Sequence, residues 1–351
     1  FDITQLSDSL MDSFTIEKST KILKNLDAKI DDYTIINQRN DSLKVDTSLT
    51  IDKYYKLNYL RDDNFELIEF SNTGHTYNTL SFVDRDNLFP GIGSSAKHYN
   101  YMQANDIDYY HVATPFTELM YRTAFVQGQL LDALFSVNTS PRFNFTIARK
   151  GLRSLGNYQH FLSSSSNFRF STNYNSKNSK YFLKTHYVSQ NLFSEENGGI
   201  REDDIVNFES GNTEFIDRSV FDPQFENADN TLQGKRFYIN QEYSFKNLTD
   251  SLNTKKWSIG NIISLENKYY QFKQTSPNLY FGESLDLSQI NDKVSFDTFL
   301  VNFNTSYNSS KFGVTTVYIN YRDVNYSFEN LADTNNDYFY ETIIDENISI
   351  G

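Results

Sequence analysis

The amino-acid sequence predicts an all-β fold, a transmembrane antiparallel up-and-down β-barrel with short turns at one end and long loops at the other. Three observations predict it: aromatic residues are abundant in a polar chain, strand-length segments alternate in polarity, and the connections alternate in length. The 351 residues include 25 Tyr and 30 Phe, yet the mean hydropathy is −0.58. Strands that face lipid on one side and water on the other combine these properties. A disordered, prion-like chain shares the composition, so the strand patterning has to decide.

Polarity alternates at every second residue from about residue 107 onward, in segments of roughly 10 to 12 residues, the length of a tilted membrane-crossing strand. In residues 167–174, for example, Phe168 and Phe170 share one face and Arg169 lies on the other. An Arg or Lys on the lipid face at mid-membrane costs about 2 to 4 kcal/mol, so the aromatic face is expected to contact lipid. The residues expected to face lipid are Phe143, Phe145, Phe168, Phe170, Phe299 and Phe303.

The opposite faces of these segments carry charged residues, and the same alternation places them in the barrel lumen. Acidic and basic residues both occur there, so the interior is expected to have mixed charge. Two interpretations stay open: the charges select passing solutes, or they satisfy one another inside a filled barrel. The residues expected to line the lumen are Arg122, Asp132, Lys150, Arg169, Lys184, His186 and Glu242.

The lengths of the connections are the third observation. Outer-membrane barrels have short periplasmic turns and long extracellular loops, so short and long connections should alternate along the chain. A soluble β-sandwich has no reason to keep that order. The tight turn at 127–129 is the exception, because it falls on the long-loop side. The other connections run short, long, short, long, medium, long and short, at residues 139–142, 151–161, 175–179, 191–234, 247–255, 267–295 and 308–311.

Composition and segment boundaries divide the chain into three regions. Residues 1–46 are expected to be a polar segment, periplasmic or flexible; residues 47–106 an extended region that plugs the barrel or adds strands; and residues 107–351 the barrel strands. The sequence lacks a run of about 18 apolar residues for a membrane helix, and its first residues lack the blocks of a signal peptide, so removal of a signal peptide is expected. The absence of Cys excludes disulfides, and a net charge of −13 argues against nucleic acid as a partner.

Motifs that would carry chemistry are weak, and the sequence predicts neither a catalytic residue nor a metal or cofactor. The five histidines (His75, His98, His111, His160, His186) lack metal-site spacing. GIGSSAK at 91–97 lacks the ending of a phosphate loop and is read as a turn. DTNNDYFYE at 333–341 has Tyr338 where a calcium loop needs Gly, which favours a solvated loop, as does the acidic stretch 195–204. Three Asp-Ser-Leu triplets match a short O-glycosylation acceptor motif, with Ser9, Ser42 and Ser251 as candidate carriers.

Four stretches between residues 47 and 200 carry a family resemblance: 47–80, 96–122, 127–161 and 189–200, which include NYLRDDNFELIEFSNTGHTYNTL and YMQANDIDYYHVATPFTELMYR. They resemble the putative porin family of Bacteroidota outer membranes, and beyond about residue 200 the match is one of pattern only. The resemblance implies an outer-membrane barrel with an extended N-terminal region and no catalytic residues. Such barrels usually end on a strand with a terminal aromatic residue, whereas this chain stops at ENISIG, so Gly351 is not expected to be the natural end.

Three functions follow, from two classes. The leading hypothesis is a porin-like barrel in outer-membrane lipid that passes small solutes by passive diffusion. The first alternative is a non-conducting barrel that serves as a subunit of a larger outer-membrane secretion or assembly complex. The second alternative is a secreted, soluble β-rich adhesin. An enzyme is the least supported class, because no grouping of Ser, His and acid or pair of carboxylates stands out.

Overall fold

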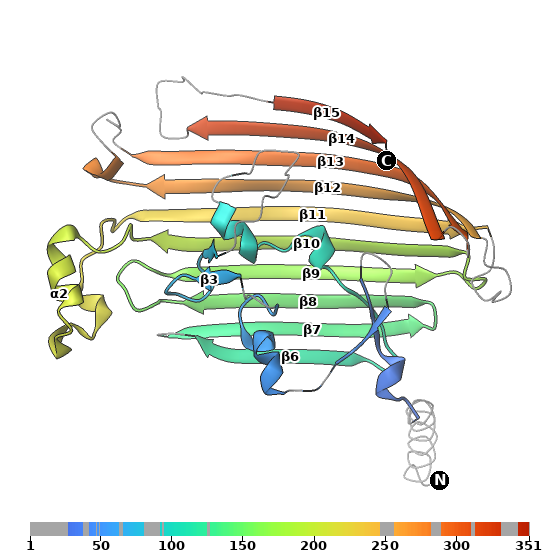
Figure 1. Ribbon diagram of the computed structural model, residues 1–351, viewed down its shortest axis with the longest axis horizontal. Helices are drawn as coiled ribbons and strands as arrows, with labels where there is room; N and C mark the ends of the chain where they lie inside the picture. Colours follow the sequence, from blue (N-terminus) through green and yellow to red (C-terminus); the bar gives the residue numbers. More distant parts are fainter. Residues whose placement is uncertain are drawn as a thin grey trace, which may run out of the picture.

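Ten antiparallel strands form one sheet, and their order in the sheet follows their order in the chain from β6 to β15 (Figure 1). The sheet strands are β6 (Phe116–Ala124), β7 (Gly128–Ser140), β8 (Phe143–Ser154), β9 (Ser163–Asn175), β10 (Tyr181–Glu196), β11 (Ala228–Ser244), β12 (Lys256–Gln274), β13 (Ile290–Ser309), β14 (Gly313–Asn330) and β15 (Ile343–Ile350). The computed structural model describes residues 27–37, 42–46, 48, 50–62, 66–80, 92, 95–124, 127–245, 256–281, 289–309, 313–330 and 343–350.

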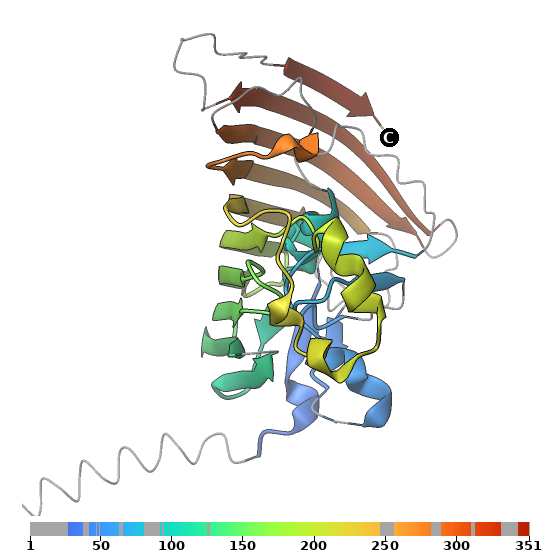
Figure 2. The same ribbon diagram turned by 90° about the vertical axis from the view of Figure 1, so that its left-hand side faces the viewer.

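The sheet is curved (Figure 2), and the strand register places its side chains alternately on the convex and the concave face. The strands pair so that one parity is kept across the sheet: Ile147 lies opposite Phe170, and Phe170 opposite Tyr187. Phe168, Phe170 and Phe303 are 39%, 36% and 59% exposed. All six residues expected to face lipid lie on the convex face: Phe143, Phe145, Phe168, Phe170, Phe299 and Phe303.

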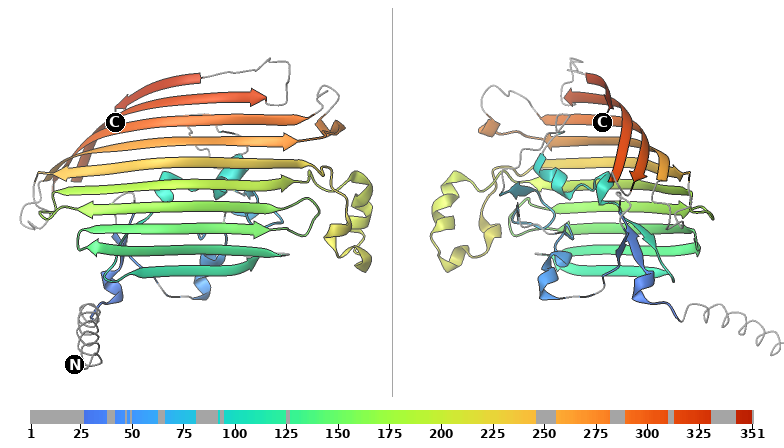
Figure 3. Two further views of the ribbon diagram at one scale, coloured as in Figure 1. Left: turned by 180° about the vertical axis from the view of Figure 1, so that it is seen from behind. Right: turned by 45° about the vertical axis from the view of Figure 1, so that its right-hand side comes forward.

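The segment before β6 does not join this sheet in its described residues and lies against the concave face (Figures 1 and 2). From behind, Figure 3 shows the strands with this segment on their far side. It contains a three-stranded sheet, in the order β2-β1-β5, and the separate hairpin β3-β4. Its elements are η1 (Ile30–Asp32), β1 (Thr34–Ile36), β2 (Ser42–Lys44), η2 (Ile51–Leu57), β3 (Leu67–Glu69), β4 (Tyr77–Thr79), η3 (Ser95–Asn100), η4 (Ala104–Asp106) and β5 (Tyr109–His111), where η denotes a 3-10 helix. We call residues 27–112 the N-terminal region.

The connections between sheet strands are mostly short at one end of the sheet and longer at the other, as the sequence predicted. The exceptions are the tight connection 125–127 on the longer side and connection 245–255 on the short side, which is longer than 155–162. The longest, 197–227, contains η5 (Glu202–Asp204), α2 (Ile205–Glu209), η6 (Thr213–Phe215) and η7 (Arg218–Val220), and η8 (Leu279–Phe281) follows β12. The short end has connections 141–142, 176–180, 245–255 and 310–312, and the long end has 155–162, 197–227, 275–289 and 331–342.

Two expectations about the strands need correction. Several strands are longer than the predicted 10 to 12 residues, reaching 19 in β12 and 20 in β13, because backbone pairing continues through polar stretches where the apolar alternation has ended. The sheet is also open in the described residues, with β6 and β15 as its edges rather than as a closing pair. No helix in the described part of the chain is long and apolar enough to span a bilayer.

Gly74 allows the β3-β4 turn to lie directly on the sheet. Its φ is +82°, and a Cβ atom there would overlap the side chain of Leu152, which packs with Tyr59 and Leu130 in a buried cluster. Gly199 has a similar φ of +90° but nothing within 4 Å of its would-be Cβ. A substitution at Gly199 therefore measures the cost of backbone strain alone, whereas a substitution at Gly74 adds the cost of a packing clash.

We expect Gly74→Ala to loosen the N-terminal region from the sheet. Left-handed backbone strain costs roughly 1–2 kcal/mol in both Gly74→Ala and Gly199→Ala, and the clash with Leu152 adds about 1–3 kcal/mol only in the first. Limited proteolysis of the full chain should cut the N-terminal region faster in Gly74→Ala than in Gly199→Ala. Equal rates for the two variants would contradict this account of the turn.

Candidate functional site

The seven residues expected to line the lumen all lie on the concave face, and six of them lie beneath or beside the N-terminal region. Three cations donate hydrogen bonds to its backbone carbonyls: Arg122 Nη1 to Leu57 O at 2.6 Å, Lys184 Nζ to Asn37 O at 3.0 Å, and Lys150 Nζ to Tyr59 O. Glu242 is partly exposed on the same face. In strand order the seven are Arg122, Asp132, Lys150, Arg169, Lys184, His186 and Glu242.

One charge cluster joins the N-terminal region to β6, β7 and β9. Asp132 accepts a hydrogen bond from Arg169 Nη2 at 3.0 Å, and its other oxygen is 3.5 Å from Arg61 Nη1. Arg61 Nη2 lies 2.6 Å from Glu118 Oε1. The side chain of Asp132 is only 12% exposed, so its two arginine partners offset the cost of burying the carboxylate.

A second cluster centres on Arg236, which is 2% exposed and which the sequence analysis did not single out. Its Nε donates to His186 Nε2 at 3.2 Å, its Nη1 to Glu266 Oε1 at 3.1 Å, and its Nη2 to the carbonyl of Met102 at 3.0 Å. Tyr101 donates to the same Glu266 oxygen at 2.7 Å. The parity that placed Glu242 on the polar face of β11 also places Arg236 there, so the signal was present in the sequence.

Gly234 on β11 makes room for this contact. A Cβ atom at Gly234 would overlap the hydroxyl and ring of Tyr101, so a larger residue there would push Tyr101 away from the sheet and from Glu266. The other side of the cluster is closed by Tyr109, whose hydroxyl lies 2.8 Å from His186 Nδ1. His186 also stacks on Tyr238, with ring centroids 4.7 Å apart and an interplanar angle of 7°.

Lys97 is the end of the GIGSSAK stretch, and its side chain is 1% exposed against the sheet. Its Nζ donates to the Asn230 side chain and to Ser194 Oγ, the latter at 3.0 Å. Burial lowers the pKa of Lys97 below its ordinary value, while the carboxylates of Glu196 and Asp229 oppose that shift. The lysine therefore anchors the N-terminal region to β10 and β11.

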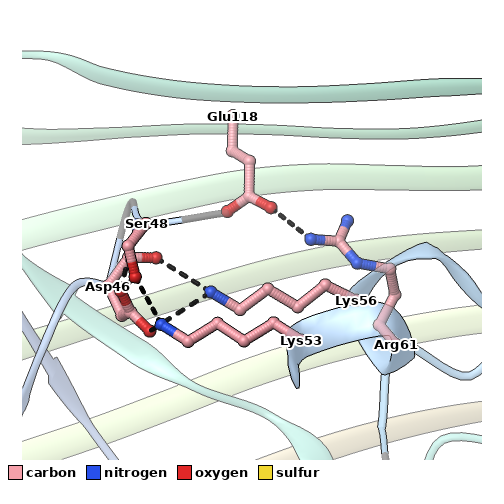
Figure 4. A network of polar contacts seen from close by, with 6 residues as sticks. All are labelled: Asp46, Ser48, Lys53, Lys56, Arg61 and Glu118. Carbon is pink, nitrogen blue, oxygen red and sulfur yellow. Dashed lines mark hydrogen bonds and ion pairs between the residues drawn. The ribbon is translucent and has the colours of Figure 1, made fainter. Parts of the chain in front are cut away.

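The carboxylate of Asp46 contacts Lys53 and Lys56 of η2, as Figure 4 shows. Its carboxylate accepts from the side chain of Lys53 and from the Ser48 hydroxyl at 2.7 Å and backbone at 3.0 Å, and Lys56 Nζ lies 3.4 Å away. The Lys53 and Ser48 hydrogen bonds hold the pKa of the exposed Asp46 well below its usual range. Beside this network, the Arg61–Glu118 ion pair links the end of the same segment to β6 (Figure 4).

The turn between β3 and β4 is fixed by buried polar groups. Asn72 Nδ2 donates to the carbonyls of Ser154 at 3.0 Å and Phe161 at 2.7 Å. His75 stacks on the Phe161 ring with centroids 4.2 Å apart. Burial, and then the nearby Lys97 charge, lower the pKa of His75 to about 4, so its imidazole is neutral at pH 7.

Among the described residues, the remaining candidates do not form a cluster suited to catalysis or to metal binding. Ser42 lies exposed in β2, while Ser9, Ser251 and residues 333–341 lie outside the described residues. In the acidic stretch 195–204, Glu195 accepts from Leu162 N at 2.9 Å and the carboxylates do not converge. Over the described ranges, no three His, Asp or Glu side chains come together at a place suited to a metal ion.

Comparison with known proteins identifies the family. The family described as "Putative porin" matches residues 29–351, nearly the whole chain, and the protein belongs to that family. The match includes the residues beyond 200, where the sequence resembles the family in pattern only. No curated protein matches this chain.

One solved structure is similar in part. The ferric-catecholate import receptor Fiu of E. coli K12, in its closed form, aligns at 9% identity and a TM-score of 0.26, covering 68% of this chain and 46% of that one. This chain therefore spans less than half of the receptor it matches. At that TM-score the alignment supports no argument about function.

We expect Asp132→Asn to destabilise the protein by roughly 1.5–3 kcal/mol, because Arg61 and Arg169 lose a charged hydrogen-bonding partner in a poorly solvated place. The double variant Asp132→Asn/Arg169→Gln should be more stable than Asp132→Asn alone, because it also removes the arginine charge that Asp132→Asn leaves unpaired. The free energy of unfolding from urea titration in detergent checks both. Asp31→Asn, which breaks the exposed Lys44–Asp31 pair, is the control and should cost less than about 1 kcal/mol. Additive effects at Asp132 and Arg169 would show that the pair is not coupled.

We expect stability to fall as the pH drops from 6.5 to about 4 through His75. The folded pKa of about 4 lies below the ordinary 6.5, so the unfolded chain binds the proton first and its population grows as the pH falls. The contribution is complete above pH 6.5 and amounts to a few kcal/mol. Burial raises the pKa of Asp108 to about 6, which acts with the opposite sign in this window. The test is therefore the difference in unfolding free energy between the wild type and His75→Phe, and a difference independent of pH would refute it.

Proposed function

We propose that this protein is an outer-membrane β-barrel channel of the porin type, whose N-terminal region occupies the part of the interior next to β6–β12 and reaches β13 and β14 through Ile92. The observation that supports this most strongly is the separation of the two faces in the half of the sheet next to the short connections: aromatic and aliphatic side chains predominate on the convex side, and charged, amide and hydroxyl side chains on the concave side. Lipid outside and a polar lumen inside require this arrangement. A soluble adhesin would not present so many exposed aromatic rings on one face.

The distribution along the strands supports a membrane band next to the short connections. On the convex face of β11, Tyr243, Ile239 and Phe237 lie toward the short end, whereas Lys235 and Asp229 lie toward the long end. The other strands repeat this order, and the apolar part has about the 9–11 residues of a membrane-crossing strand. We therefore infer that the long ends of the strands and connection 197–227 project beyond the bilayer on the extracellular side.

The proposed solute path runs over the part of the concave face that the described residues of the N-terminal region do not contact. On the concave face of β13 and β14, near the short end, Asn302 Nδ2 donates to Asn320 Oδ1 at 2.5 Å and Asn304 Nδ2 donates to Asn302 Oδ1 at 2.8 Å. Ser306 and Thr316 share a hydrogen bond of 2.9 Å beside them. This surface carries amides and hydroxyls, which suits small polar solutes with weak selectivity for charge. The charges expected to set selectivity are instead held largely by contacts with the N-terminal region.

The filled concave face also favours a second candidate, a non-conducting barrel within a larger outer-membrane complex. Arg236, Lys184 and His186 are each at most 2% exposed, so that part of the interior leaves no aqueous path. In this case the purified chain would show no channel activity and would copurify stoichiometrically with other outer-membrane proteins. Passive diffusion predicts stable conductance from the purified chain alone.

We expect Asn320→Asp to make the conductance of planar bilayers holding the full chain selective for cations, because a fixed carboxylate beside the path raises the local cation concentration. Asn325→Asp, on the convex face of the same strand, is the matched control and should leave the reversal potential unchanged. The readout is the reversal potential in a salt gradient. The proposed path is refuted if the wild type forms no channels or if both variants shift the reversal potential by the same amount.

A further inference from the structure

A cavity of about 680 Å³ lies at the long end of the sheet, away from the polar path described above. It is enclosed mainly by the β3-β4 turn, connection 155–162, connection 197–227 and the concave side of β12, and Ala96, Glu196 and Asn230 complete the lining. Its volume falls in the range of small-molecule binding sites, about 300–1,000 Å³.

The walls of the cavity are mainly aromatic. Rings reach it from every enclosing part, including Tyr158 and Phe161 from connection 155–162 and Phe208 from α2. Some of these rings are held in place by their neighbours: Phe208 packs edge-on against Phe221 at 5.6 Å, and Tyr158 against Phe161 at 6.0 Å. Such a lining binds flat, apolar ring faces. The aromatic residues are Phe70, Tyr158, Phe161, Phe208, Phe225, Tyr270 and Phe272.

The polar groups of the lining set the rest of the ligand's chemistry. His75 is 2% exposed, lines the cavity, and its Nε2 has no hydrogen-bond partner. The His75 ring is neutral, and its hydrogen bond with the Phe161 backbone uses the other ring nitrogen. Nε2 therefore carries no proton and can only accept a hydrogen bond. Glu196 adds a carboxylate whose Oε1 already accepts a hydrogen bond from Asn230 Nδ2. The described lining residues include no Lys or Arg, so nothing there would neutralise an anion.

We propose that this cavity binds a neutral ring compound that carries hydroxyl groups. The ring face lies against the aromatic walls. His75 Nε2 has almost no accessible surface, so the imidazole shifts within the wall to accept from a ligand hydroxyl, which satisfies an acceptor that is otherwise buried and unpaired. A sugar and a phenol share this chemistry. The site faces the long connections, so it is reached from the side of the membrane opposite the short turns. The inference does not depend on whether the barrel conducts.

The test is isothermal titration calorimetry of the full chain in detergent with three probes: methyl β-glucoside, resorcinol and glucose 6-phosphate. Binding of either neutral probe supports the site and shows which source of hydroxylated ring it prefers. His75→Phe keeps the ring stack but removes the acceptor, and should weaken binding roughly tenfold, as expected when a ligand hydroxyl loses its partner. Tyr158→Leu should weaken binding similarly without touching the buried turn.

Tyr54→Ala is the control, because Tyr54 is an exposed aromatic residue of η2 that does not line the cavity. Its affinity for the probes should equal that of the wild type. The inference is overturned if neither neutral probe binds at millimolar concentration, if glucose 6-phosphate binds as well as methyl β-glucoside, or if Tyr158→Leu and His75→Phe both bind like Tyr54→Ala. Because the readout is heat of binding, a failure here is distinct from a failure to conduct.

Discussion

The constraint on which this structure depends is the strand register, which keeps alternate residues of every strand on the same face of the sheet. A slip of one residue in any strand pairing would turn that strand's aromatic face inward and its charges outward. The pairings from β6 to β15 keep one parity, apart from a bulge at Asn138 and Ser140 near a turn. Each strand therefore adds its polar residues to one concave surface, so that Arg169, His186 and Arg236 become neighbours although they lie far apart in the chain.

The N-terminal region supplies hydrogen-bond partners for the charged side chains that this register places on the concave face. The concave face carries more cations than nearby carboxylates satisfy, and an unpaired buried charge is costly. Backbone carbonyls of Asn37, Leu57, Tyr59 and Met102 accept hydrogen bonds from Lys184, Arg122, Lys150 and Arg236. These carbonyls are available because the region is built of 3-10 turns and very short strands, which leave many backbone groups without an internal partner. Its lack of regular structure is thus what lets it bind the sheet.

This arrangement divides the concave side into three environments. Beneath the N-terminal region, charged side chains are buried and paired. Toward the short end of β13 and β14, amides and hydroxyls bond to one another on a partly exposed surface. At the long end, aromatic rings surround a cavity beside His75. A solute path and a ligand site can therefore occupy the same protein without sharing residues.

The sequence alone determined the faces of the strands and the parity of the connections, because both are local properties: side chains alternate every second residue, and turn residues mark where a strand ends. All seven lumen candidates lie on the concave face and all six aromatic candidates on the convex face, while their contact with a lumen or with lipid stays a prediction. The sequence left Arg236, Glu266 and Lys97 unnoticed as partners, because their roles depend on contacts between residues up to 165 positions apart. Whether residues 47–106 plug or extend the sheet was likewise open, since β-strand pairing and packing onto a face use the same residue types. Only the tertiary structure places the described part of this region outside the ten-stranded sheet and against its concave face, where carbonyls and tyrosines contact the buried charges of the sheet.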